Sequence, residues 1–142
     1  VTIQAQILDL MQSIVADTQT SILLITHDLG IVAGIADRVL VMYAGQIVET
    51  GDVYSIFQRP QHPYTKALLQ ALPDISTKKP LATIPGSPPD LHTPIKGCAF
   101  CPRCPYAMRV CAEFSPSPFS LEQEREASCW LHHTHGAPHN TL

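Results

Sequence analysis

The sequence Ser21-Ile-Leu-Leu-Ile-Thr-His-Asp-Leu-Gly30 decides the fold, because a short apolar run is followed at once by polar residues. The apolar part, residues 21–25, is too short for a helix and is typical of a strand buried on both faces. Residues 1–19 place apolar side chains on one helical stripe, namely Ile3, Ile7, Leu10, Met11 and Ile14. A helix followed by a buried strand predicts an α/β fold with parallel strands.

The residues after this strand predict a short helix and then a β-hairpin. Leu29, Val32, Ala33 and Ala36 recur at helical spacing, and Asp28 is placed to cap that helix. Residues 38–43 and 46–50 read as two strands joined by a turn at Ala44-Gly45.

Two further helices are predicted after the hairpin. Asp52 is a candidate N-cap for a helix through Phe57. Pro63 favours a helix start, with Tyr64 and Leu68 as packing partners one turn apart. His62, next to Pro63, could be a ligand, but a structural role at the helix start is the favoured interpretation.

Composition limits the classes of protein that this chain can represent. Its 142 residues suffice for one domain or two small ones, and 45% of them are hydrophobic. The formal net charge of -3 gives no electrostatic reason to expect a nucleic-acid partner. No apolar run approaches the roughly 20 residues that cross a bilayer. The chain opens without Met or a signal-peptide pattern, so we expect it to begin inside a domain.

Proline marks a boundary in the chain. All 13 prolines lie from Pro60 onward, and residues 73–94 are expected to be extended and loop-like. We therefore predict one region over residues 1–59, a second over residues 60–131 and a disordered tail over residues 132–142. The tail includes His132, His133, His135 and His139, which are not favoured as ligands.

His27 is the first candidate functional residue. It follows the predicted strand by two residues, and ligands of open parallel sheets collect beyond the carboxyl ends of the strands. A neutral imidazole can donate one hydrogen bond and accept another, which suits contact with a phosphate oxygen. On spacing alone, a partly buried histidine that caps a helix start is the favoured interpretation.

The wider string ILLITHDLGIVAGIADRVLVMYAGQIVETG, residues 22–51, resembles the ATP-binding subunits of ABC transporters. The resemblance implies that His27 is the switch histidine that contacts the γ-phosphate of ATP, with Mg²⁺ as the second cofactor. It also implies that residues 1–11 form the helix that follows the D-loop. The expected fold class is then α/β, the C-terminal part of a P-loop ABC ATPase domain with a parallel strand, helices and a β-hairpin, plus a small Pro/Cys-rich extension.

Several motifs of that family are absent from this sequence. It contains no G-x-x-x-x-G-K-[ST] phosphate loop and no LSGGQ-like signature. One histidine cannot hold a γ-phosphate without the backbone nest and lysine of that loop. We therefore expect ATPase activity in a full-length parent and inactivity in this chain alone.

The second half of the chain narrows the resemblance. The strings HPYTKALLQALP and IPGSPPDL resemble the C-terminal extension of the oligopeptide and dipeptide branch, which includes nickel importers. This implies an importer of di- or oligopeptides or nickel. The implied partners are transmembrane permease subunits, a second ATP-binding subunit and, indirectly, an extracellular or periplasmic substrate-binding protein. The implied location is the cytoplasmic face of the cell membrane, as a peripheral subunit.

Five cysteines form the second candidate site. They all lie between Cys98 and Cys129, and their odd number argues against a fully paired disulfide framework. Four thiolates satisfy either a tetrahedral zinc ion or a [4Fe-4S] cluster. The spacing is looser than that of paired zinc knuckles, and five reduced thiols without metal is a further alternative.

The peptide-importer branch carries a related pattern, GCxFxPRCPxAxxxC followed by CW, and some members bind a [4Fe-4S] cluster there. This resemblance implies that Cys98, Cys104, Cys111 and Cys129 are the metal ligands, with the cluster favoured over zinc. Cys101 departs from the pattern as a fifth thiol. The alternative to a transporter subunit is a free-standing cysteine-ligated metal or iron-sulfur module.

Overall fold

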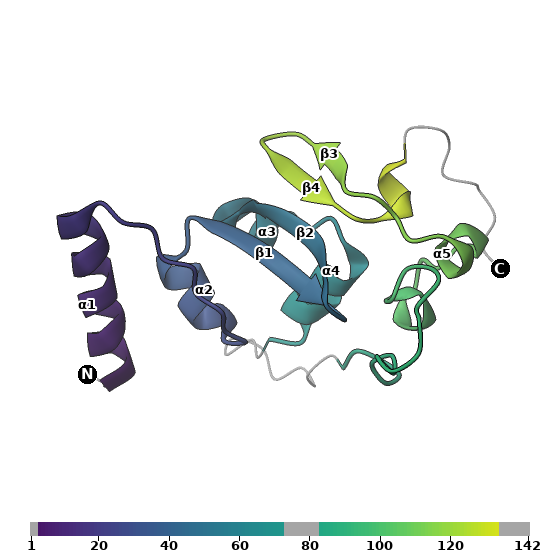
Figure 1. Ribbon diagram of the computed structural model, residues 1–142, viewed down its shortest axis with the longest axis horizontal. Coiled ribbons are helices and arrows are strands. Elements are labelled where there is room, and N and C mark those ends of the chain that lie inside the picture. Colours follow the sequence, from purple (N-terminus) through teal and green to yellow (C-terminus); the bar gives the residue numbers. More distant parts are fainter. Residues whose placement is uncertain (1–2, 73–82, 134–142) are drawn as a thin grey trace. The chain divides into compact units, whose positions relative to one another are not determined.

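The computed structural model describes residues 3–72 and 83–133, and Figure 1 shows their elements in chain order. Their contacts define two compact units, one up to Asp37 and one from Arg38 onward. Within the described residues, no helix combines the length and the apolarity needed to cross a membrane.

The first unit consists of two helices, as predicted. α1 runs over Ile3–Thr18 and α2 over Leu29–Ile35. The Asp28 carboxylate accepts hydrogen bonds from the backbone N–H groups of Gly30 (2.8 Å) and Ile31 (3.2 Å). The predicted cap of α2 is therefore confirmed.

The predicted strand over residues 21–25 does not form. The structure assigns no strand there, and the side chains of Leu23 and Ile25 are 83% and 88% exposed. A strand buried on both faces needs hydrogen-bonded neighbours and covering layers, and the described residues of this unit provide no strand. The apolar run therefore remains an extended segment without a sheet.

The second unit is built on a four-stranded sheet with the order β1-β2-β4-β3 (Figure 1). The strands are β1 (Arg38–Tyr43), β2 (Gln46–Asp52), β3 (Phe119–Leu121) and β4 (Arg125–Ala127). All pairs are antiparallel, as the predicted hairpin requires, and the parallel strand expected at residues 21–25 is not present among the described residues. The predicted β1-β2 hairpin is present, and both residues of its turn have positive φ, 49° at Ala44 and 78° at Gly45.

Two helices follow the hairpin, close to the predicted positions. They are α3 (Val53–Gln58) and α4 (Pro63–Gln70), which begins at Pro63. The Asp52 carboxylate caps α3 by accepting from the backbone N–H of Ser55 at 2.8 Å. Hydrogen bonds from Ser55 lower the pKa of Asp52 from its ordinary value.

The C-terminal part carries short helical turns and the last hairpin. Its elements are η1 (Cys101–Arg103), α5 (Arg109–Glu113), β3, β4 and η2 (Trp130–His132). Residues 83–94 contain no helix or strand, as expected, and residues 73–82 lie outside the described residues. The predicted tail begins too early, because His132 belongs to η2 and the His133 ring packs on Trp130. Residues 134–142 lie outside the described residues.

The core of this unit joins the hairpin to the cysteine-rich segment. Its buried members are Val41, Tyr43, Val48, Ile56 and Phe100. The Phe100 ring lies edge-on to Tyr43, with the centroids 5.2 Å apart. The unit therefore runs across the predicted boundary between residues 59 and 60, and the assignment of residues 1–59 to a nucleotide-binding domain stays a prediction.

Arg103 fastens the Pro-rich segment to this core. Its guanidinium donates to the backbone oxygens of Pro85 (2.8 Å) and Ile84 (3.1 Å), and to the Tyr43 hydroxyl (3.2 Å). A planar guanidinium can serve three acceptors in different directions, which a lysine ammonium at the end of a flexible stem reproduces poorly.

We expect the substitution Arg103→Ala to lower the free energy of unfolding by about 2 kcal/mol, because it removes charged hydrogen bonds. Arg103→Lys should recover only part of this loss. The measurement is urea denaturation followed by circular dichroism, with the exposed Arg109→Ala as the control. Equal stability of the Arg103→Ala and Arg109→Ala variants would contradict the assignment.

Candidate functional site

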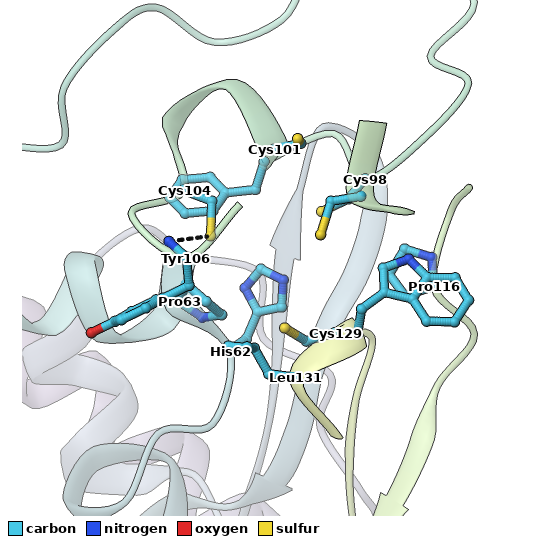
Figure 2. Close-up of a pocket in the computed structure, with 12 residues that line it drawn as sticks. His62, Pro63, Cys98, Cys101, Cys104, Tyr106, Pro116, Cys129 and Leu131 are labelled. Carbon is cyan, nitrogen blue, oxygen red and sulfur yellow. Dashed lines mark hydrogen bonds between the residues drawn. The ribbon is translucent and has the colours of Figure 1, made fainter. Parts of the chain in front are cut away.

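The five cysteines gather around one pocket in the second unit (Figure 2). They come from the loop before η1, from η1 and its end, from α5 and from the residue before η2. His62, Phe100 and Trp130 complete much of its wall. The structure therefore brings together all four predicted ligands, which span 32 residues of the chain from Cys98 to Cys129.

Backbone hydrogen bonds position the cysteine segments. The Cys98 N–H donates to the Cys111 carbonyl at 2.7 Å, which joins the first cysteine loop to α5. The Trp130 indole donates to the Phe114 carbonyl at 2.9 Å, which ties η2 to the residue that ends α5. The Tyr106 N–H points at the Cys104 sulfur at 3.4 Å (Figure 2).

Burial sets the protonation state of these thiols. It is the main cause that raises the pKa of Cys104 and of Cys129 to about 11, with smaller contributions from neighbouring thiols. The pKa of Cys98 is also raised, chiefly by burial, although N–H groups of Phe100 and Cys101 oppose the shift. Without a bound cation, Cys98, Cys104 and Cys129 are therefore neutral thiols near pH 7.

This protonation predicts low reactivity with alkylating reagents. A pKa of about 11 in place of 9.0 leaves about a hundredfold less thiolate at pH 8. We expect Cys104 and Cys129 to react with iodoacetamide about a hundredfold more slowly in the folded chain than in 8 M urea, with the rate still rising above pH 9. Peptide mass spectrometry measures each site, and equal rates in the two states would refute the shift.

Cys101 differs from the other four. The pKa of Cys129 is influenced by the thiols of Cys104, Cys98 and Cys111, but Cys101 is not among its causes. The pKa of Cys101 is raised by burial and then by the thiols of Cys111 and Cys98, and Cys101 in turn raises the pKa of Cys104. Cys101 and Cys129 are thus the two thiols that do not influence each other, and these influences do not single out the four residues named by the sequence pattern.

The described residues contain no group of three or more His, Cys, Asp or Glu side chains arranged to hold a metal ion. A tetrahedral zinc site needs four sulfurs about 2.3 Å from the ion and therefore about 3.8 Å from one another. The cysteines share a pocket without meeting that requirement. Their role as metal ligands stays a prediction.

His62 has a larger part in this site than its sequence context indicated. The residue is 1% exposed and its ring lines the cysteine pocket (Figure 2). Its Nδ1 accepts the Tyr64 N–H at 3.0 Å, so the ring is also the N-cap of α4. Burial is the main cause that lowers the pKa of His62 to about 4, with smaller contributions from the nearby His132 and Lys66. The ring is therefore neutral at pH 7.

A buried ion pair between Glu49 and Arg125 holds the backbone at His62. The Glu49 carboxylate, 1% exposed, accepts the backbone N–H groups of Gln61 (2.7 Å) and His62 (2.8 Å). Arg125 lies 3.3 Å from Glu49 and also donates to the Arg59 carbonyl at 2.6 Å. Sequence analysis missed this pair, and residues 76 positions apart leave no local pattern that would reveal it.

His27 lies in the first unit, in the bend just before the N-cap of α2. Its side chain is exposed. The imidazole is therefore accessible within the first unit. Its predicted contact with a γ-phosphate stays a prediction.

Comparison with known proteins shows that the chain is similar to ATP-binding proteins of peptide transport. It is 53% identical over 135 residues to the oligopeptide transport ATP-binding protein OppD of Bacillus subtilis, which covers 94% of this chain and 38% of that protein. It is 49% identical over 134 residues to AmiE of Streptococcus pneumoniae, an oligopeptide transport ATP-binding protein, covering 94% and 38% of the two chains. It is 46% identical over 130 residues to the dipeptide transport ATP-binding protein DppD of Escherichia coli, covering 91% and 40%.

Residues 48–111 match the family described as the Oligopeptide/dipeptide transporter, C-terminal region. This match confirms the resemblance that the sequence motifs predicted. It spans about two fifths of the length of the curated relatives that it matches.

Proposed function

We propose that this chain is the C-terminal part of an ATP-hydrolysing subunit of an ABC importer for di- or oligopeptides or nickel. The proposal rests on sequence similarity. Over more than nine tenths of its length, the chain is 49–53% identical to proteins named for oligopeptide and dipeptide transport. The similarity includes both the β1-β2 hairpin and the cysteine segment. The alternative, a free-standing metal module, does not explain why residues 3–52 resemble a transport ATPase.

The apolar surface of the first unit supports the same proposal. Residues 22–25 are exposed, and so is the apolar stripe of α1, which contains Ile3, Ile7, Leu10 and Ile14. Each large aliphatic side chain that becomes buried contributes roughly 1.5–3 kcal/mol before entropic costs. We infer that strands of the full-length subunit cover residues 22–25 and complete the sheet that the sequence predicts.

In the full-length subunit, His27 would contact the terminal phosphate of ATP held with Mg²⁺. An exposed, uncommitted imidazole at the start of α2 is free to make such a contact. A hydrogen bond to a charged group contributes about 1.5–3 kcal/mol. Permease subunits, a second ATP-binding subunit and a substrate-binding protein are the proposed partners, with the subunit peripheral at the cytoplasmic face of the membrane.

The proposal is tested in the full-length parent assembled with its permease. His27→Ala should reduce ATP hydrolysis about tenfold to hundredfold, which corresponds to the loss of about 1.5–3 kcal/mol in the transition state. His92→Ala, at another exposed histidine, is the matched control. Full activity of the His27→Ala assembly would refute the assigned role, and a parent without a phosphate loop would refute the proposed function itself.

The 142-residue chain by itself should show no ATP turnover. It lacks the glycine-rich nest and lysine that grip the β- and γ-phosphates. Isothermal titration with ATP and Mg²⁺ should give no measurable heat of binding, and a phosphate-release assay should give the rate of buffer alone. Turnover that tracks the purified chain through gel filtration would contradict this expectation.

We also propose that Cys98, Cys104, Cys111 and Cys129 hold a [4Fe-4S] cluster. The four sulfurs line one pocket, and in such a cluster each iron takes one thiolate. Backbone N–H groups reach the sulfurs of Cys98, Cys104 and Cys129, where they would stabilise thiolates. The cluster would cross-link a segment with little core of its own.

Cysteine substitutions test this second proposal. After anaerobic reconstitution with ferrous iron and sulfide, the chain should show the broad absorbance of a thiolate-bound iron-sulfur cluster, at about 400 nm. Cys129→Ser should lose the cluster, and Cys101→Ser should keep it. Colourless protein with one zinc per chain would favour the zinc alternative, and protein without metal would leave five reduced thiols.

A further inference from the structure

The His62 ring is held rigidly at the wall of the cysteine pocket. It is 1% exposed, and it lines the pocket together with all five cysteines. The Phe100 ring lies 6.0 Å away at an interplanar angle of 56°, which limits rotation of the imidazole. Figure 2 shows the ring among the sulfur atoms of Cys98, Cys104 and Cys129.

Two anchors fix the position of this ring. On the backbone side, the His62 N–H donates to the Glu49 carboxylate at 2.8 Å, and Arg125 holds that carboxylate in place. On the side-chain side, Nδ1 accepts the Tyr64 N–H at 3.0 Å. A side chain bound at its backbone and at one ring nitrogen has little freedom left, so its remaining nitrogen occupies a defined place.

The second anchor also fixes the tautomer. A ring nitrogen that accepts a backbone N–H carries no proton, and a neutral imidazole has one proton in total. The proton of His62 therefore lies on Nε2, the nitrogen on the far side of the ring from the α4 cap. The cysteine pocket thus has an N–H donor in its wall in addition to the backbone groups at the sulfurs.

We propose that His62 is a positioning residue of the cysteine site, whose Nε2–H donates a hydrogen bond to a sulfur atom of the group that the cysteines bind. The inference rests on the proposed cluster. Hydrogen bonds to the sulfurs stabilise the more negative, reduced form of an iron-sulfur cluster and so raise its reduction potential. His62 thereby tunes the potential while it caps α4.

Two substitutions separate these two duties of the ring. The side-chain oxygen of asparagine lies near the place of Nδ1, so His62→Asn retains the cap but has no donor at the place of Nε2. The amide nitrogen of glutamine lies near the place of Nε2, so His62→Gln retains a donor but caps poorly. The pair is matched in polarity and differs in which ring nitrogen it replaces.

The experiment uses the full 142-residue chain, reconstituted anaerobically with ferrous iron and sulfide. Iron and sulfide content are measured first, then the midpoint potential by dye-mediated titration followed by electron paramagnetic resonance, and finally the melting temperature. We expect His62→Asn to keep the iron content and the melting temperature but to have a more negative potential. We expect His62→Gln to melt lower and to keep the potential of the wild-type chain.

The outcomes separate the inference from the proposal on which it rests. If the wild-type chain takes up no iron and sulfide, the cluster and the role of His62 are both overturned. If the wild-type chain takes up the cluster and the potential of His62→Asn is unchanged, only the role of His62 is overturned. The same holds if the potential follows the melting temperature in both variants, because the effect then comes from the α4 cap.

Discussion

The variant Glu49→Gln should unfold with a free energy about 3–5 kcal/mol below that of the wild-type chain, because it breaks a buried ion pair from one side only. Glu49 has a side-chain exposure of 0% and Arg125 of 7%. The substitution leaves the Arg125 charge buried without its carboxylate, and a neutral amide serves the N–H groups of Gln61 and His62 less well.

Urea denaturation of the second unit, followed by the fluorescence of Trp130, measures this effect. The matched control is Glu124→Gln, which removes the carboxylate of an exposed ion pair with Arg38. The side chains of that pair are 52% and 89% exposed, so water already screens the interaction and stability should hardly change. Equal losses in Glu49→Gln and Glu124→Gln would show that the buried pair is not a principal support of the fold.

The second large effect is expected at Gly97, where the backbone of α5 leaves no room for a side chain. A Cβ atom there would overlap the carbonyl oxygen of Cys111 and would lie 2.6 Å from the carbonyl carbon of Ala112. These are backbone atoms and cannot rotate away. The Cys98 to Cys111 hydrogen bond of 2.7 Å would have to open.

Gly97→Ala should therefore lower the free energy of unfolding by about 3 kcal/mol, the upper part of the usual range for overpacking. It should also accelerate alkylation of Cys111, because α5 is displaced from the first cysteine loop. The control is Gly34→Ala in α2, where a Cβ meets nothing within 4 Å and alanine favours the helix by about 0.5–1 kcal/mol. Unchanged stability and unchanged alkylation in Gly97→Ala would contradict the close approach.

Sequence reasoning succeeded where structure depends on neighbouring residues. The turn at Ala44-Gly45, the Asp28 and Asp52 caps and the helix start at Pro63 all depend on residues a few positions apart, and all are present. Turn and cap geometry follows from local backbone chemistry, so a single sequence carries enough information to predict it.

Sequence reasoning failed where a segment needs partners from elsewhere. The run at residues 21–25 has the composition of a buried strand, but composition does not supply neighbouring strands, and the described residues before Arg38 hold none. The extension of the hairpin into a four-stranded sheet was missed for the same reason, because β4 pairs with β2 from over 70 positions away, β3 pairs only with β4, and each of these two strands has three residues. Short strands have no periodicity to detect.

The sequence predicted the cysteines of the candidate site but not the residues that hold the site in place. The pattern from Cys98 to Cys129 identified residues that the fold gathers around one pocket. The roles of His62 and Glu49 depend on contacts with distant segments, and the histidine was assigned only to a helix start. A histidine directly before a proline at a helix N-terminus was the one local signal, because its ring nitrogen can replace the usual capping oxygen.

The pairing of Glu49 with Arg125 has a consequence for how this region can change in evolution. Glu49 lies on β2 and Arg125 lies on β4. Loss of β4 would therefore leave the Glu49 carboxylate buried without its counterion. A related protein could lose the cysteine-bearing segment only after Glu49 had been replaced by an uncharged residue. Natural proteins that end soon after α4 should therefore carry a neutral side chain where this chain has Glu49.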